Sequence, residues 1–177
     1  MIPELGQLAL ILALIVASVQ GIVPLVGAAR RDATLMAFAR PAAITQFVLV
    51  AIAFGCLAAS FLASDFSVVN VAQNSFSALP DHYKLAATWG SHEGSLLLWA
   101  LMLGGWSCAV ALRSKNLPAP MLARVLAVMG LVAVGFLLFL LLTSNPFERL
   151  VPAAAEGRDL NPLLQDPGMV LHPPLLY

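Results

Sequence analysis

Three histidines are the side chains in this sequence best suited to chemistry, because a neutral imidazole can ligate a metal and titrates near neutral pH. His172 stands in a proline-rich tail, residues 156–177, and is followed directly by Pro173 and Pro174. A proline disfavours the helical region for the residue before it and offers no N–H for a strand partner. We therefore expect His172 to lie on a stiff, extended and irregular peptide, presented as a ligand.

A second group of candidates lies at the expected start of a membrane helix. Ser91 fits the N-cap and Glu93 the first turn of that helix. His92 beside Glu93 could be a ligand oriented by a carboxylate, and Trp89 could form a flat wall for a planar ligand. The same residues also fit structural roles, His92 in capping or loop packing and Trp89 as a tryptophan at the membrane interface. The sequence leaves these alternatives open, and it leaves His82 as a further candidate.

The composition determines the class of protein that must position these side chains. Apolar residues make up 60% of the 177-residue chain, charged residues only 10%, and the mean hydropathy is +0.91. Soluble domains average about 25% charged residues, so the sequence indicates an integral membrane protein. The net charge is zero, and nothing in the chain points to nucleic acid. Cys56 and Cys108 lie far apart in apolar runs and read as packing residues.

Four uncharged runs are long enough to cross a bilayer. Spanning the hydrocarbon core takes about 20 residues, and only helices with closed backbone hydrogen bonding suit such runs. The sequence predicts an all-α, polytopic membrane helix bundle, with helices near 5–29, 41–64, 94–112 and 125–146. Residues 1–146 form the four-helix transmembrane region. Residues 147–177 form an irregular surface segment that carries His172 and leads into a fifth helix.

Basic residues set the expected orientation. Six of the nine Lys and Arg residues lie in two short loops that the four helices place on one side: Arg30, Arg31, Arg40, Arg113, Lys115 and Arg124. Positive charge in short loops marks the cytoplasmic side. The N-terminus, the segment 65–93 and the tail from 147 are then on the outer side, which in a bacterial inner membrane is the periplasm.

The helices themselves show packing patterns and no ion path. Small residues recur at four-residue spacing in two of the helices, which predicts close helix–helix seams; the two sets are Ala9, Ala13, Ala17 and Gly21, and Ala51, Gly55, Ala59 and Ala63. Gln20 is expected to form an interhelical hydrogen bond. The four uncharged runs contain no ionisable residue of the kind that usually marks an ion path, which counts against transport.

Four motifs stand out in this chain: Trp89-Gly-Ser-His-Glu-Gly-Ser-Leu-Leu-Leu-Trp99, Asn145-Pro-Phe147, Gly157-Arg-Asp-Leu-Asn-Pro-Leu-Leu-Gln-Asp-Pro-Gly168 and Leu171-His-Pro-Pro-Leu-Leu-Tyr177. Together they resemble the CcmF family, the large membrane subunit of the bacterial cytochrome c maturation haem lyase. The resemblance extends over essentially the whole chain, from Pro3 onward. The family's tryptophan-rich segment and its further histidines lie beyond Tyr177. We therefore expect this chain to be a fragment or one product of a split gene.

The resemblance implies a function that the residues alone do not. The family receives haem from a periplasmic haem chaperone (CcmE-like) and supports its thioether attachment to the Cys-x-x-Cys-His motif of apocytochrome c. By resemblance His172 is an outer-face axial ligand to haem iron, with Trp89 and His92 as surroundings of the haem site. Implied cofactors are b-type haem and substrate haem. Implied partners, besides membrane lipid, are CcmH- and CcmI-like subunits that reduce thiols and present the apocytochrome. Haem lyase activity is expected only within such a complex; the alternatives are a non-catalytic membrane scaffold or a transporter subunit.

Overall fold

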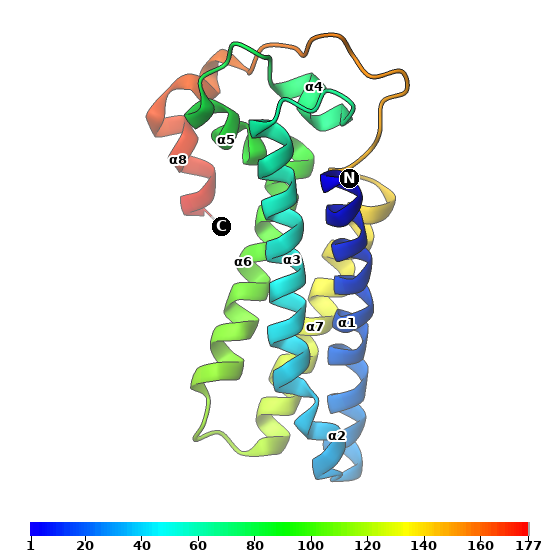
Figure 1. The fold of residues 1–177 in the computed structure, drawn as a ribbon. Coiled ribbons are helices and arrows are strands. Elements are labelled where there is room, and N and C mark those ends of the chain that lie inside the picture. The colour runs from blue at the N-terminus through cyan, green and yellow to red at the C-terminus, as the bar shows by residue number, and fades with distance from the viewer. Residues whose placement is uncertain (177) are drawn as a thin grey trace.

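The fold is a bundle of long helices with an irregular layer across one end (Figure 1). The structure, a computed structural model, describes residues 1–176, and for Leu163, His172, Pro173, Pro174 and Leu176 it describes the backbone alone. Four of its helices are long and apolar enough to cross a membrane: α1 (Ile2–Arg30), α3 (Ala39–Leu62), α6 (His92–Arg113) and α7 (Ala119–Leu142). The predicted all-α, multi-pass membrane bundle is confirmed.

The two basic loops meet at one end of the bundle. The short helix α2 (Ala33–Ala37) joins α1 to α3 and is capped by Asp32, whose carboxylate accepts hydrogen bonds from the backbone N–H groups of Thr34 and Leu35. Arg40 donates a 3.0 Å hydrogen bond to the carbonyl of Ser114 in the α6–α7 loop. The basic loops predicted to share one side of the membrane are therefore direct neighbours.

The first small-residue seam forms as the sequence predicts. α1 lies between α3 and α7, and Ala9, Ala13, Ala17 and Gly21 are all buried. A Cβ placed on Gly130 of α7 would lie 3.0 Å from the backbone nitrogen of Gly21 and 3.1 Å from the Ala17 carbonyl oxygen. Gln20 also bridges these two helices, since its side-chain amide donates a 2.8 Å hydrogen bond to the carbonyl of Leu126. Backbone contact therefore holds α1 against α7.

The second predicted seam is wrong. Gly55 is exposed, with no atom within 4 Å of a Cβ built on it, and Ala63 is exposed as well. α3 instead buries a different stripe, which includes Val50, Ala53 and Leu57. Small residues in a membrane helix permit close approach without requiring it.

The segments 63–91 and 143–176, which we call the extramembrane layer after their predicted position, lie at the end of the bundle opposite α2, and α8 runs down from there beside the bundle (Figure 1). It contains α4 (Val69–Asn74), α5 (Asp81–Gly90), the 3₁₀ helix η1 (Pro162–Gln165) and α8 (Pro167–Leu176). The segment between the second and third spans, read as a loop from sequence, thus holds two helices. The fourth spanning helix ends at Leu142, and the layer begins where Thr143 takes the C-cap position.

The chain from 147 to 158 lies along the segment 67–77. Val69 donates its N–H to the Glu148 carbonyl, and Leu150 donates to the Ser67 carbonyl, at 2.9 and 2.8 Å. Farther on, a Cβ at Gly157 would stand 1.9 Å from the carbonyl oxygen of Ser75. Only glycine permits that approach, and beyond Gly157 the chain continues over the surface of α5.

Candidate functional site

His172 lies in a helix and not on the extended peptide that the sequence predicts. Its backbone belongs to α8, while its imidazole lies outside the described atoms. The cause is the start of the helix. The carboxylate of Asp166 accepts hydrogen bonds from the N–H groups of Gly168 (2.8 Å) and Met169 (3.2 Å), and Pro167 has the fixed φ that suits a first helical position. Asp166-Pro167-Gly168 therefore starts the helix that carries His172.

The two prolines after His172 remove hydrogen bonds without ending the helix. In an α-helix the N–H of residue 174 would donate to the carbonyl of Val170, but Pro174 has no N–H. The Val170 carbonyl instead accepts a 3.0 Å hydrogen bond from the indole Nε1 of Trp89. Trp89 lies near the end of α5 and is the first residue of the motif that ends at Trp99. This motif is thus joined directly to α8, about eighty residues farther along the chain.

Two further contacts hold the tail on α5. The hydroxyl of Tyr83 donates a 2.9 Å hydrogen bond to the carbonyl of Gln165, the last residue of η1. Gly90 lies under Leu164, because a Cβ at Gly90 would come within 2.8 Å of the Leu164 side chain. α5 therefore supports the tail at three successive places, just before and within the helix that carries His172.

The other two histidines lie on the neighbouring helices. Ser91 is the N-cap of α6, as predicted, and its hydroxyl oxygen accepts a 3.0 Å hydrogen bond from the N–H of Gly94. His92 is the first residue of α6, and its ring meets Phe139 of α7 edge-on at 6.4 Å between centroids. The ring of His82 lies 4.2 Å from that of Tyr83. Within the described residues, no group of three or more His, Cys, Asp or Glu gathers as a metal site.

A buried lysine fixes α5 over the bundle. Lys84 is only 6% exposed, and its ammonium donates to the hydroxyl of Ser64 (2.9 Å) and to the carbonyl of Ser77 (3.1 Å). Ser77 in turn donates its N–H and hydroxyl to the carboxylate of Glu156 at 2.9 and 2.6 Å. These hydrogen bonds, the Ser77 hydroxyl foremost, hold the pKa of Glu156 below its usual range. This chain of contacts ties α3, α5 and the tail together, and sequence reasoning missed it because nothing local marks it.

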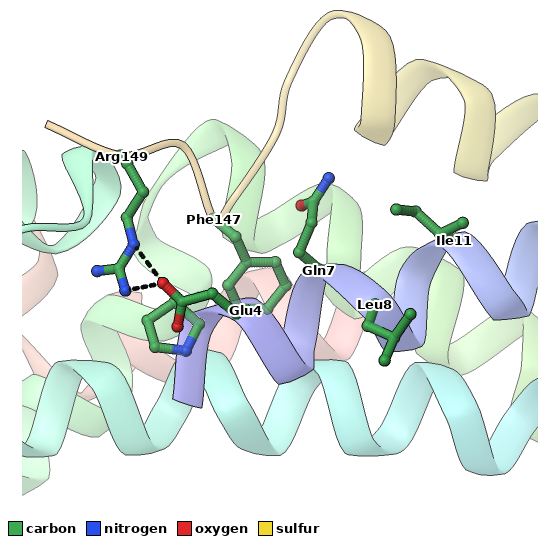
Figure 2. Close-up of a pocket in the computed structure, with 7 residues that line it drawn as sticks. Glu4, Gln7, Leu8, Ile11, Phe147 and Arg149 are labelled. Carbon is green, nitrogen blue, oxygen red and sulfur yellow. Dashed lines mark hydrogen bonds and ion pairs between the residues drawn. The ribbon is translucent and has the colours of Figure 1, made fainter. Parts of the chain in front are cut away.

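The tail is also fastened where it begins. Arg149 forms an ion pair with Glu4 in the first turn of α1 (Figure 2). It forms a second ion pair with Asp65 at 3.5 Å. The ring of Phe147 is buried against Gly6, where a Cβ would lie within 2.3 Å of it. Glu4, Phe147 and Arg149 help line a groove of about 270 Å³ beside α1. This anchor was not predicted from the sequence. Pro3 and Phe147 both line the groove, yet they lie far apart in the chain.

Comparison with known proteins decides the family. The model for the family described as cytochrome c assembly protein matches residues 89–177, half of the chain. The chain belongs to the cytochrome c assembly protein family. The match begins at Trp89 and contains His92, the η1 segment and α8. The matched region therefore includes both Trp89 and Val170, the two partners of the hydrogen bond between α5 and α8.

Individual relatives of this family extend the match to the whole chain. The chain is 64% identical to the cytochrome c-type biogenesis protein CcmF of Pseudomonas aeruginosa and 56% identical to that of Escherichia coli K12, with all of it covered in both cases. It spans 27% and 28% of those proteins' lengths, respectively. The solved structure of a cytochrome c haem lyase CcmF matches 84% of the chain with a TM-score of 0.78 at 28% identity, using 25% of its own length. The CcmF resemblance read from the motifs is confirmed.

Proposed function

We propose that this chain is the haem-receiving part of a cytochrome c maturation haem lyase, with His172 as an axial ligand on the periplasmic face. The chain belongs to the cytochrome c assembly family, and a similar solved structure is titled a haem lyase. The observation that carries the proposal is the fastening of α8 to α5. The one histidine of the tail lies on a helix that is held by Trp89, the first residue of one of the family's motifs.

The residues around His172 fit haem. An imidazole nitrogen is a common axial ligand of haem iron, and the porphyrin is a large, flat and mostly apolar ring. α8 exposes apolar side chains at Met169, Leu171 and Leu175, which are 40%, 59% and 82% exposed. A helix that offers both an imidazole and uncovered apolar surface matches the donor and the shape that haem requires.

The chain's own residues would bind and orient haem. When bound, the haem iron and vinyl groups supply the chemistry of attachment. α8 would present the imidazole, and the exposed Leu171 and Leu175 would cover porphyrin surface. Trp89 and His92 stay within this proposal as residues of the surrounding surface. Of these two residues, Trp89 is the one whose described hydrogen bond reaches α8.

The proposed setting follows from charge. The basic loops around α2 face the cytoplasm, and the extramembrane layer faces the periplasm of a bacterial inner membrane. On that side the layer would receive haem from a CcmE-like chaperone and act on apocytochrome c. CcmH- and CcmI-like subunits would reduce and present the Cys-x-x-Cys-His thiols there. The haem concerned includes substrate haem and, in the complete assembly, a b-type haem.

The test is the absorption spectrum of the protein as the cell makes it, purified from membranes. His172→Ala should remove the Soret band of the substrate haem, whereas the control His82→Ala should retain it. Cells with His172→Ala should accumulate haem on the chaperone and lack holocytochromes c. Normal holocytochrome levels and an unchanged Soret band in that variant would refute the ligand assignment.

A further inference from the structure

Trp89 supplies a hydrogen bond that the sequence of α8 cannot make for itself. The helix runs from Pro167 to Leu176 and contains Pro174, so the carbonyl of Val170 has no N–H partner within its own helix at that position. The indole N–H of Trp89 reaches this carbonyl at 3.0 Å. The turn bounded by Val170 and Pro174 is the turn that contains the backbone of His172.

Tryptophan has the right chemistry for this role. Its indole nitrogen is a donor only, and its rigid ring loses little rotamer freedom when it is held between two helices. The bond is partly buried, so the Val170 carbonyl is partly shielded from water. Unpaired carbonyls in such places cost free energy, which is why nearly all of them find partners. The loss of the indole N–H would leave the turn around His172 free to shift or fray.

We propose that Trp89 is a positioning residue for His172, because its indole N–H takes the place of the backbone N–H that Pro174 lacks. The link to haem rests on the proposed function. The replacement of a backbone N–H by the indole N–H is a property of α8 itself and can be tested without haem. Trp89 thus acts through Val170 and the helix turn, and no contact between Trp89 and a ligand is needed.

The test is a rescue experiment on the haem-depleted protein, purified from membranes in its natural length. Trp89→Phe keeps the ring and removes the donor. Amide hydrogen exchange in residues 168–172 should then rise about two- to tenfold, the range expected for the loss of one hydrogen bond. Adding Pro174→Ala restores a backbone donor to Val170, and exchange in the double variant should return to within about twofold of the wild-type rate. Trp106→Phe is the matched control, since Trp106 is 67% exposed on α6, and it should leave exchange unchanged.

The proposal is overturned if Trp89→Phe leaves the exchange of residues 168–172 unchanged, or if Pro174→Ala fails to restore protection. A purely packing role for the tryptophan ring would predict the first result, because Trp89→Phe keeps an aromatic ring. Haem binding provides a separate readout. The Soret maximum and the haem affinity should shift in Trp89→Phe and recover in the double variant. If His172→Ala leaves the Soret band intact, the ligand assignment fails while the exchange result still stands. If His172→Ala removes the band but Trp89→Phe leaves amide hydrogen exchange unchanged, only the positioning role of Trp89 fails.

Discussion

The Nε–H group of Arg149 donates a 3.0 Å hydrogen bond to the carboxylate of Glu4, which joins the start of the tail to the first turn of α1. The hydrogen bond with Glu4 raises the pKa of Arg149 above its already high usual value, so the guanidinium keeps its charge at every pH of interest. Asp65 pairs with the same guanidinium. Three segments of the chain therefore meet at one cation.

A double-mutant cycle with Glu4→Gln and Arg149→Gln should reveal a coupling between these two side chains. Both are partly exposed, so the coupling should be modest and should shrink as ionic strength rises. The measurement is thermal unfolding in detergent at low and at molar salt. A coupling that is absent at low salt, or that is insensitive to salt, would mean that the pair does not anchor the tail.

Gly94→Ala should destabilise the junction of α5 and α6. A Cβ there would lie 1.8 Å from the carbonyl oxygen of Thr88, so the backbone must move, and the cost should be about 3 kcal/mol, at the upper end for overpacking. Gly105→Ala on the same helix is the control, because its Cβ would stand 3.6 Å from the Phe47 ring. Equal melting temperatures for the two variants would contradict the geometry at Gly94.

The two glycines of α7 should respond in opposite ways to alanine. A Cβ at Gly130 meets the backbone of α1 at 3.0 Å, whereas a Cβ at Gly135 meets nothing within 4 Å. Gly130→Ala should cost about 1–3 kcal/mol, and Gly135→Ala should be neutral or stabilising by up to about 1 kcal/mol through helix propensity. Unfolding of the two purified variants under identical conditions measures the difference, and a destabilised Gly135→Ala with a neutral Gly130→Ala would reverse our description of the seam.

The contact between Glu156 and Ser77 should weaken in acid. The folded protein lowers the pKa of Glu156 from a usual value near 4.5, chiefly through the Ser77 hydroxyl. The stabilisation is therefore fully present above that usual value and is lost as the pH falls through the lower, folded pKa. The melting temperature of wild type should exceed that of Glu156→Gln at neutral pH, and the gap should close well below pH 4.5.

Glu148→Gln is the control for this titration. Glu148 enters the layer through its backbone carbonyl, which accepts from Val69, so neutralising its side chain should leave the tail contact intact. If the gap between wild type and Glu156→Gln is the same at acidic and neutral pH, the carboxylate charge plays no part in holding Ser77.

The membrane bundle could be predicted because its signal is local. Each candidate spanning helix appears in the sequence as one uncharged run, and the hydrogen bond from Arg40 to Ser114 agrees with the prediction that the two basic loops lie on one side. The packing seams were less predictable. The stripe of Gly55 has the same spacing as the stripe of Gly21, yet only the latter is buried. Spacing identifies a face that can pack closely, while the shapes of the partner helices decide which face does.

The residues named for the site remain a prediction, whereas the local structure predicted for His172 is wrong. Pro173 suggested an extended His172, yet an Asp166 cap and Pro167 start a helix that continues through both later prolines. The rule for residues before proline describes a local preference, and here tertiary contacts override it. The contact that does so, Trp89 to Val170, joins residues 81 positions apart. No window of neighbouring sequence contains both partners.

The path of the tail has a consequence for synthesis. Its partners Glu4, Ser67, Ser77, Tyr83 and Trp89 all precede it in the chain. A ribosome therefore completes the docking surface before the segment that docks on it. Residues 147–176 can therefore settle in the order in which they emerge, first at α1 and last at α5.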